Sequence, residues 1–375
     1  MKVALIIFSP NFFGGGNKFA SELISCLIEN DIDIAICSME LPIKNRSYNE
    51  FFNVKNWFVP KVKWNIGKLY KIMINQKIIL KKLIKKFKPD IIIGADTEPS
   101  VMTGIKIKKI LYVHFPTEIK AYAHSLFHEI YRSIYWWQHY KALKELDAIV
   151  CNSEYTKNIT YLLWGNVQSD KDKYIVIYPC VNINKFIKKV EREPNKICYV
   201  GRLDKNKGID YVLEAFKNIK CEIPDIKLSI VGGVKGSVYA EKYYPELLSK
   251  IKNINDIEIK IDVPDEVIVN TLLRSRCMLS YNPGEHFGIV PIEAMAAGCP
   301  PIVADGGGQR ETVIHGETGF LAKTPKDLII YTKKLLIDEE LFKNMSEKAR
   351  IHAAKFDKKE FCKKWIQLIQ NIVEK

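Results

Sequence analysis

Residues 197–208 read Ile-Cys-Tyr-Val-Gly-Arg-Leu-Asp-Lys-Asn-Lys-Gly, and this stretch decides the fold. Positions 197–201 form an apolar run of strand length, which ends in a polar loop before a helical pattern. The same order of strand, loop and helix recurs along almost the whole chain. Strands of a parallel sheet are buried on both faces and are therefore nearly continuous in Ile and Val. The sequence thus predicts the α/β fold class with parallel sheets.

The other expected strands share this apolar composition. They cover residues 3–8, 32–37, 91–94, 111–115, 148–152, 174–178, 228–232, 257–261, 278–281, 301–304 and 319–321. Around residues 178–194 the pattern lapses into Pro, Asn and charged residues and then restarts. We therefore predict an N-terminal domain over residues 1–181 and a C-terminal domain over residues 182–357. A last helix, within residues 358–375, is expected to pack back on the first domain.

The composition bounds the class of protein. A chain of 375 residues, 47% hydrophobic and 27% charged, is typical of a globular protein with two domains. No apolar run approaches the roughly 18 residues that span a bilayer, and the N-terminal run lacks the length and cleavage site of a signal peptide. The nine cysteines are scattered without a C-x-x-C pair. This predicts a reducing, cytoplasmic compartment and neither a disulfide framework nor a zinc ribbon.

The net charge of +14 is concentrated in residues 61–88, which contain ten lysines and no acid. Within this segment Leu80, Leu83, Ile84 and Phe87 fall on one helical face. Such a basic amphipathic helix can lie on an anionic membrane surface. It can equally be a solvated helix that buries its apolar stripe in its own domain. Nucleic acid is a third possible partner, but no nucleic-acid motif accompanies the charge, so we predict none.

Residues 127–140 are rich in Tyr and Trp, side chains that suit a membrane interface and equally a helix core. His124 lies just before this segment and His128 lies within it, so the two are four residues apart, as in a metalloprotease helix. The acid of the pair, Glu129, follows the second histidine instead of standing between the two. We therefore predict no zinc site here and no metal elsewhere.

Glycines follow the first strand. Gly14, Gly15 and Gly16 precede a helix, and glycine lets the backbone approach a phosphate or sugar closely in front of a helix N-terminus. The spacing fits neither the G-x-G-x-x-G dinucleotide fingerprint nor the P-loop. A tight turn with Asn17 as the helix N-cap is the alternative.

Two strand ends carry basic side chains. Arg202 and Lys207 follow the expected strand at 197–201, and ligands of open α/β sheets collect at such carboxyl ends. Arginine offers planar two-point contact and lysine a point charge, so the pair can neutralise a diphosphate. A solvated basic loop is the alternative. His114, near the end of the strand at 111–115, can hydrogen-bond a reacting sugar, with a structural role as its alternative.

Residues 284–298 read Gly-Glu-His-Phe-Gly-Ile-Val-Pro-Ile-Glu-Ala-Met-Ala-Ala-Gly. Glu285 and Glu293 stand eight residues apart across a predicted loop-to-helix junction. Backbone N–H groups of Phe287, Gly288 and Ile289, at the helix start, can meet a phosphate. The carboxylates are then acceptors for sugar hydroxyls. The alternative is a helix with one exposed and one capping glutamate.

Together these motifs resemble glycosyltransferase family 4, retaining enzymes with the GT-B fold. The resemblance extends from Gly14 to Met295 and continues through Gly306-Gly307-Gly308 and residues 315–321. Residues 285–295, with Val-His-Phe-Pro at 113–116 and Cys-Asn-Ser-Glu-Tyr-Thr at 151–156, are most similar to the mannosyltransferases that extend the dolichol-linked oligosaccharide for N-glycosylation. The resemblance implies two Rossmann-like parallel-sheet domains that face a cleft.

The same resemblance implies roles for individual residues. Arg202 and Lys207 would bind the donor diphosphate, Glu293 the nucleotide ribose and Glu285 the donor sugar, with His114 close to the reacting carbon. The remaining implied donor-binding residues are Gly15 and Gly16 from the opposite domain, Gly232 and Val263 near the base, and His286, Phe287, Gly288 and Ile289 at the helix start.

The expected function is therefore transfer of a hexose, namely mannose from GDP-mannose, onto a polyprenyl- or dolichol-linked glycan at the cytoplasmic face of a membrane. Residues 61–88 are expected to contact anionic lipid. No cofactor or metal is expected, because Arg202, Lys207 and the helix start near Gly288 can stabilise the leaving diphosphate. The alternatives are a UDP-sugar-dependent transferase acting on another glycan or lipid, an epimerase or phosphorylase, and a non-catalytic subunit that binds nucleotide sugar.

Overall fold

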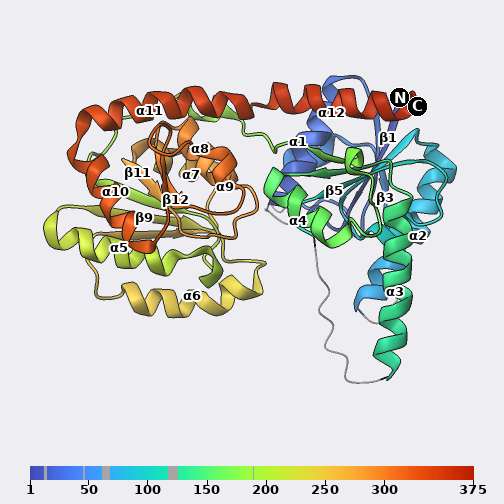
Figure 1. The fold of residues 1–375 in the computed structure, drawn as a ribbon, viewed down its shortest axis with the longest axis horizontal. Coiled ribbons are helices and arrows are strands. Elements are labelled where there is room, and N and C mark those ends of the chain that lie inside the picture. The colour runs from blue at the N-terminus through green and yellow to red at the C-terminus, as the bar shows by residue number, and fades with distance from the viewer. Residues whose placement is uncertain (12–14, 45–46, 61–67, 117–125, 189) are drawn as a thin grey trace. The chain divides into compact units, whose positions relative to one another are not determined.

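The computed structural model describes residues 1–11, 15–44, 47–60, 68–116, 126–188 and 190–375. The chain divides into two compact units (Figure 1). Unit 1 comprises Met1–Cys180 and Lys358–Lys375, and unit 2 comprises Val181–Asp357. The C-terminal helix α12 (Lys358–Val373) therefore belongs to the unit that contains the N-terminus.

Unit 1 is built on a parallel sheet with helices packed on it. From one edge to the other its strands are β3 (Asn56–Phe58), β2 (Asp33–Cys37), β1 (Lys2–Ile7), β4 (Ile91–Asp96), β5 (Lys108–Val113), β6 (Ala148–Cys151) and β7 (Tyr174–Val176). Besides α12, its helices are α1 (Gly15–Glu29), α2 (Lys68–Phe87), α3 (Leu126–Lys144) and α4 (Glu154–Trp164), with short 3-10 turns at Asn49–Asn53, Pro99–Met102 and Lys171–Lys173. The chain goes from β1 to β2 and β3 on one side and then returns to β4 on the other.

Unit 2 repeats this plan. Its sheet is also parallel, in the order β10 (Ile257–Ile261), β9 (Lys227–Gly232), β8 (Lys196–Val200), β11 (Cys277–Leu279), β12 (Pro301–Ala304) and β13 (Phe320–Ala322). Its helices are α5 (Ile209–Glu222), α6 (Val238–Ile251), α7 (Asp265–Arg274), α8 (Ile289–Ala296), α9 (Gln309–Thr312), α10 (Pro325–Ile337) and α11 (Glu339–Ala353), with 3-10 turns at Ile183–Phe186, Lys205–Lys207 and Ala354–Phe356.

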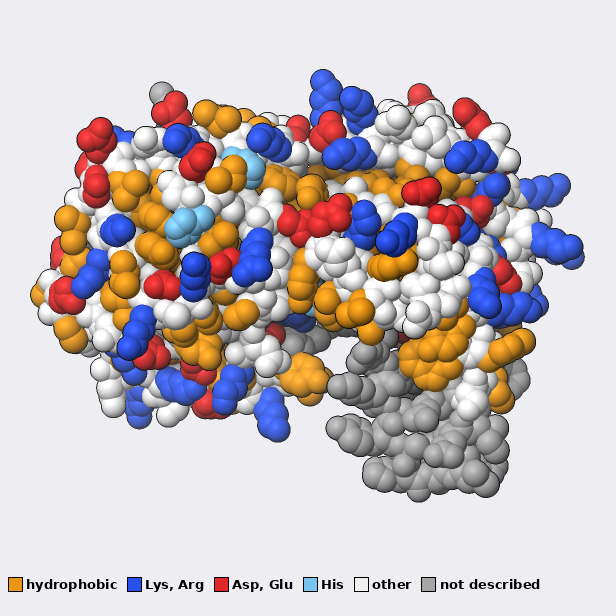
Figure 2. All heavy atoms as spheres, viewed as in Figure 1, with side chains coloured by type: hydrophobic (Ala, Val, Ile, Leu, Met, Phe, Trp, Pro, Cys, Tyr) orange, Lys and Arg blue, Asp and Glu red, His pale blue; other side chains and the backbone are white. Residues whose placement is uncertain are grey.

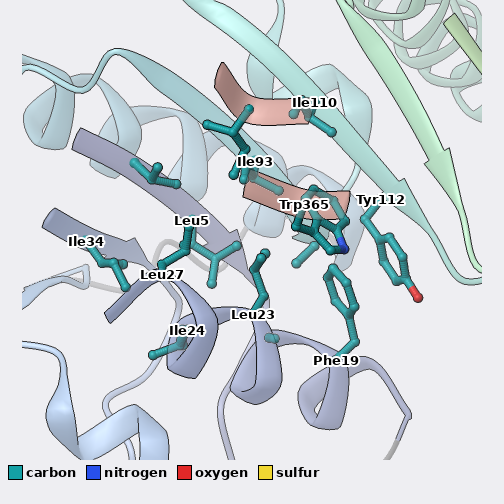
Figure 3. Close-up of a cluster of buried hydrophobic side chains, with 14 of the residues drawn as sticks. Leu5, Phe19, Leu23, Ile24, Leu27, Ile34, Ile93, Ile110, Tyr112 and Trp365 are labelled. Carbon is teal, nitrogen blue, oxygen red and sulfur yellow. The ribbon is translucent and has the colours of Figure 1, made fainter. Parts of the chain in front are cut away.

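Helix α12 packs against α1 and completes the core of unit 1 (Figure 3). Trp365 is fully buried there. The Phe19 ring stacks on Tyr112 with centroids 3.5 Å apart, and Trp365 lies 5.5 Å from Phe19. The last helix thus supplies a large aromatic side chain to a core that also contains Phe19 and Tyr112, which lie 346 and 253 positions earlier in the sequence.

The predicted parallel α/β architecture is confirmed, and each expected strand overlaps an observed one. The bounds differ at several ends. Strand β5 ends at Val113, so His114 lies in the loop that follows it. Strand β11 ends at Leu279, so Tyr281 lies outside the sheet. Strand β3 was not expected, because its three residues are too short for a recognisable alternation.

The N-cap assignment for Asn17 is wrong. Helix α1 already begins at Gly15, so Gly15 and Gly16 form its first turn instead of a loop before it. Asn17 is buried in the helix, and its side-chain amide donates to the backbone oxygen of Ser9 at 2.9 Å. Gly14 lies outside the described residues. The local sequence favoured a cap, but the side chain instead ties α1 to the end of β1.

Helix α2 buries its apolar stripe within unit 1. Leu80 and Leu83 are fully buried in the core below the sheet, and Ile84 and Phe87 pack against the same core. The structure therefore agrees with the alternative in which the helix buries its apolar stripe in its own domain. Contact of the lysines with anionic lipid stays a prediction. The lysines at 81, 82, 85, 86 and 88 are exposed. Residues 61–67 lie outside the described part of the chain.

On the face seen in Figure 2, basic and acidic side chains are interspersed over both units. Among the residues that the structure describes, no helix combines the length and the apolar character needed to cross a bilayer. The histidines considered for zinc, His124 and the side chain of His128, lie outside the described part.

Candidate active site

The carboxyl ends of the unit 2 strands gather most of the predicted site residues at one edge of the sheet. Arg202 and Lys207 follow β8, Gly232 ends β9, Val263 follows β10, and Glu285 follows β11. The chain passes from β8 to β9 and β10 on one side and then to β11 on the other side. The order of strands therefore reverses between β8 and β11, and ligands of open α/β sheets bind in the crevice at such a switch point.

Gly208 brings the loops after β8 and β11 into contact. Its φ of 72° is in the left-handed region, and a Cβ atom there would lie 1.8 Å from the backbone oxygen of Tyr281. Only glycine permits both the conformation and the approach. Asp204 begins the turn before it by accepting a hydrogen bond from the backbone N–H of Asn206 at 3.0 Å. As a result Lys207 is held beside the loop that carries Glu285.

Three successive glycines in the loop after β12 support the Glu285 loop from behind. Cβ atoms at Gly306, Gly307 and Gly308 would lie 2.4, 2.1 and 2.2 Å from the backbone oxygens of Pro283, Glu285 and His286, respectively. The backbone N–H of Gly308 also donates to the oxygen of Glu285 at 2.8 Å. These glycines are required for backbone-to-backbone packing.

Lys207 and Glu285 form an ion pair, with Nζ 2.7 Å from Oε2. The side-chain amide of Asn282 donates to the same carboxylate oxygen at 3.1 Å. Burial alone would raise the pKa of Glu285, but the charge and hydrogen bond of Lys207, with help from Asn282, hold that pKa below its usual range. Glu285 is therefore an ionised acceptor, and its oxygens have fixed directions.

The predicted loop-to-helix junction at residues 284–298 is confirmed. Glu285 lies in the loop and Glu293 in α8, and Gly288 caps the helix with a left-handed φ of 92°. The first N–H groups of a helix have no intrahelical acceptor and carry the positive end of its dipole. Beside this helix start, burial lowers the pKa of His286, so its imidazole is neutral at pH 7.

Gln309, a residue next to the start of α8, was not predicted from the sequence as part of the site. Gln309, the first residue of α9, is 1% exposed, and its Oε1 has no hydrogen-bond partner among the described residues. Its Cγ would lie 3.4 Å from a Cβ atom at Gly288. The side chain therefore borders the N-terminus of α8. The one sequence feature that could have indicated this residue is its position directly after the three glycines 306–308.

Unit 1 places the other predicted residues at the corresponding edge of its own sheet. Gly15 and Gly16 start α1 after β1, and a Cβ atom at Gly15 would meet no atom of the described residues within 4 Å. His114 is half-buried after β5, and its ring lies edge-on to Tyr112 with centroids 4.7 Å apart. Asn152 holds the backbone there by donating to the oxygen of His114 at 2.9 Å.

Two parallel-sheet units of this topology define the GT-B class of glycosyltransferase folds. The solved structure of Anabaena HepE in complex with UDP matches 99% of this chain and 100% of its own, with a TM-score of 0.73 and 16% sequence identity. The predicted GT-B fold is therefore confirmed.

Within this class the chain belongs to glycosyltransferase family 4. Residues 13–185 match the model described as Glycosyltransferase Family 4, and residues 181–352 match that described as Glycosyl transferases group 1. Over 281 residues the chain is 29% identical to the alpha-1,3/1,6-mannosyltransferase alg-2 of Neurospora crassa, covering 63% of this chain and 59% of that protein. Over 241 residues it is 31% identical to the alpha-1,3/1,6-mannosyltransferase ALG2 of Saccharomyces cerevisiae, covering 54% and 47%. The match thus spans about half the length of these relatives.

Proposed function

We propose that this protein is a retaining mannosyltransferase that moves mannose from GDP-mannose onto a polyprenyl-linked oligosaccharide. The observation that carries the proposal is the Lys207–Glu285 pair at the switch point of unit 2, next to the start of α8. A cation and a helix N-terminus suit a diphosphate, and an ionised carboxylate suits sugar hydroxyls. The named activity of the Neurospora and yeast relatives favours mannose as the sugar.

In this proposal the donor rearranges the ion pair. The diphosphate takes Lys207 as its counterion, together with the exposed Arg202 and the N–H groups of Phe287, Gly288 and Ile289. Glu285, released from Lys207, accepts hydrogen bonds from the sugar. Glu293 binds the ribose, while Gly232 and Val263 border the base and His286 lies beside the diphosphate. The cations and the helix start carry the leaving-group charge, so the proposal needs no metal.

The reacting groups come from both units. Gly15 and Gly16 border the diphosphate, and His114 lies close to the anomeric carbon. The acceptor hydroxyl attacks that carbon from the side of the leaving group, the bond to the phosphate oxygen breaks, and a phosphate oxygen takes the acceptor proton.

The acceptor is proposed to lie at the cytoplasmic face of a membrane. We propose that exposed side chains of α2 and α3 in unit 1 contact this membrane. Ile74 and Ile78 on α2 and Trp137 on α3 are 37%, 41% and 61% exposed. Lys141 Nζ lies 5.3 Å from the Trp137 ring centroid, and burial together with the nearby charge of Lys81 lowers the pKa of Lys77. Exposed apolar side chains beside lysines are typical of binding to anionic lipid.

The donor and the reaction are tested together. Purified protein is screened by thermal shift with GDP-mannose, UDP-sugars and ADP-sugars, because a ligand of the native state raises the unfolding temperature. Transfer is then measured with a lipid-linked glycan. We expect stabilisation by GDP-mannose and release of GDP only when the acceptor is added. Stabilisation by a UDP-sugar would favour the alternative donor, and donor binding without transfer would favour a non-catalytic subunit.

The site assignment is tested with two lysines of one turn. Lys207→Ala should abolish both stabilisation by the donor and transfer. Lys205→Ala is the matched control, because Lys205 is exposed in the same 3-10 turn and forms no ion pair with a described residue. Unchanged transfer by the Lys207 variant would contradict the assignment.

A further inference from the structure

A cavity of about 740 Å³ opens at the C-terminal end of α8, the end opposite to the proposed donor site. Among the described residues, its charged lining consists of three cations, Lys188, Arg192 and Arg350, and one acid, Glu191. Most of the remaining lining is apolar and includes Phe186, Leu273 and Ala296. The cavity therefore combines an excess of positive charge with an apolar wall.

The two arginines converge on one backbone oxygen. Nη2 of Arg192 and Nη2 of Arg350 each donate to the oxygen of Ala297 at 2.8 Å. Arg192 Nη1 also donates to the oxygens of Leu272 and Ser275, and Arg350 Nη1 donates to that of Ala296. The guanidinium groups are consequently close to each other, although they come from segments far apart in the chain.

These contacts use only part of the hydrogen-bonding capacity of the pair. Three hydrogen bonds engage Arg192 and two engage Arg350, whereas each guanidinium has five N–H donors. Within the described residues, neither arginine forms an ion pair with a carboxylate. The printed contacts therefore leave part of the hydrogen-bonding capacity of the two guanidinium groups unused.

The positive charge of the two arginines also exceeds the negative charge of the described residues around the cavity, where Glu191 is the one acid. A helix C-terminus offers only about half an elementary negative charge, whereas the two guanidiniums carry two positive charges. Burial and the neighbouring charge of Arg192 lower the pKa of Arg350, as expected for two cations that lack a counterion. A bound anion would offset this repulsion and occupy the remaining donors in the planar two-point manner that arginine favours.

We propose that this cavity binds a phosphate group, carried on a molecule whose apolar part packs on Phe186, Leu273 and Ala296. The arginine pair supplies the hydrogen bonds, and Lys188 adds a third positive charge. This site is separate from the proposed donor site, and its existence does not depend on the glycosyltransferase activity.

The test is isothermal titration of the whole chain with inorganic phosphate and with phenyl phosphate. We expect phenyl phosphate to bind roughly tenfold more tightly, because its ring is removed from water by the apolar wall. Equal affinities would identify free phosphate as the ligand. Each titration is repeated on Lys207→Ala, which disables the proposed diphosphate site. Binding that persists there belongs to the cavity, and binding that disappears overturns the proposal.

Ile187 gives a variant that leaves the fold intact. It lines the cavity and is 73% exposed, so a charge there costs little stability. Ile187→Glu should weaken phenyl phosphate binding about fivefold, and Ile187→Lys should strengthen it by a similar factor. Lys343→Gln, a change on the exposed face of α11 outside the cavity lining, is the control and should have no effect. Affinities that are the same in both Ile187 variants would overturn the site.

Discussion

The two units end their parallel strands in contrasting ways. In unit 2 the loops at the carboxyl edge are packed backbone against backbone, and a Cβ atom at Gly208 would lie 1.8 Å from the oxygen of Tyr281. In unit 1 a Cβ atom at Gly15 would meet no described atom within 4 Å. Glycine is thus required for packing at Gly208, whereas at Gly15 the packing of the described residues gives no reason for it.

The two carboxyl edges also differ in the residues that surround their predicted site side chains. The edge of unit 2 holds the ion-paired Glu285 and Lys207, whereas His114 in unit 1 is packed among aromatic rings. A diphosphate and a sugar require charges and acceptors in fixed positions. The comparison therefore indicates that unit 2 holds a charged pair on closely packed loops, whereas the described start of α1 in unit 1 is loosely packed at Gly15.

The largest effect is expected from Gly208→Ala. The clash with Tyr281 and the left-handed φ should together destabilise unit 2 by about 3–5 kcal/mol. Gly15→Ala should change the free energy of unfolding by less than about 1 kcal/mol. Both are measured by chemical denaturation. Equal free energies of unfolding for the two variants would contradict the proposed difference in glycine packing between the two edges.

A smaller effect, on transfer instead of folding, is expected from Glu285→Gln. The uncharged amide is a weaker acceptor for sugar hydroxyls, so turnover should fall about 100-fold, or about 2.7 kcal/mol. Glu222→Gln is the matched control, since Glu222 forms an ion pair of the same 2.7 Å length with Lys333 away from the strand ends. Loss of activity in the control as well would mean that any broken ion pair in unit 2 inactivates the protein.

The pH dependence of stability should sharpen the comparison further, with a smaller effect. The pKa of Glu285 is held below its ordinary value of 4.5, so its stabilising interaction is present above that value and is lost as the pH falls through the folded-state pKa. Unfolding followed between pH 6 and pH 3 should therefore show a steeper loss of stability in the wild type than in Glu285→Gln. Parallel curves would contradict the pairing.

The smallest effect concerns the exposed surface of unit 1. Trp137→Ser should reduce binding to anionic vesicles about fivefold in a flotation assay and leave transfer to a water-soluble acceptor unchanged. Leu162→Ser on α4 is the control, because Leu162 is 75% exposed on the same unit but lies on another helix. Equal binding by the Trp137 variant and the wild type would remove this residue from the proposed membrane surface.

The amino-acid pattern was enough to predict the α/β class, the strands other than β3 and the junction at Gly288. Apolar runs and glycines act within a few residues, so these features are visible in a local pattern. It also indicated Arg202, Lys207, Glu285 and Glu293 as charged residues near strand or helix ends, as the structure places them.

Which of these residues meet depends on the three-dimensional arrangement of the strands. The contact between Lys207 and Glu285 joins positions 78 residues apart, and it depends on strands β8 and β11 being neighbours in the sheet. Packing also decided between alternatives that the local pattern left open, since Asn17 bonds to Ser9 instead of capping a helix and the stripe of α2 is buried in its own unit. A one-dimensional pattern carries helical and strand periods but not strand order, and strand order sets the distances between side chains.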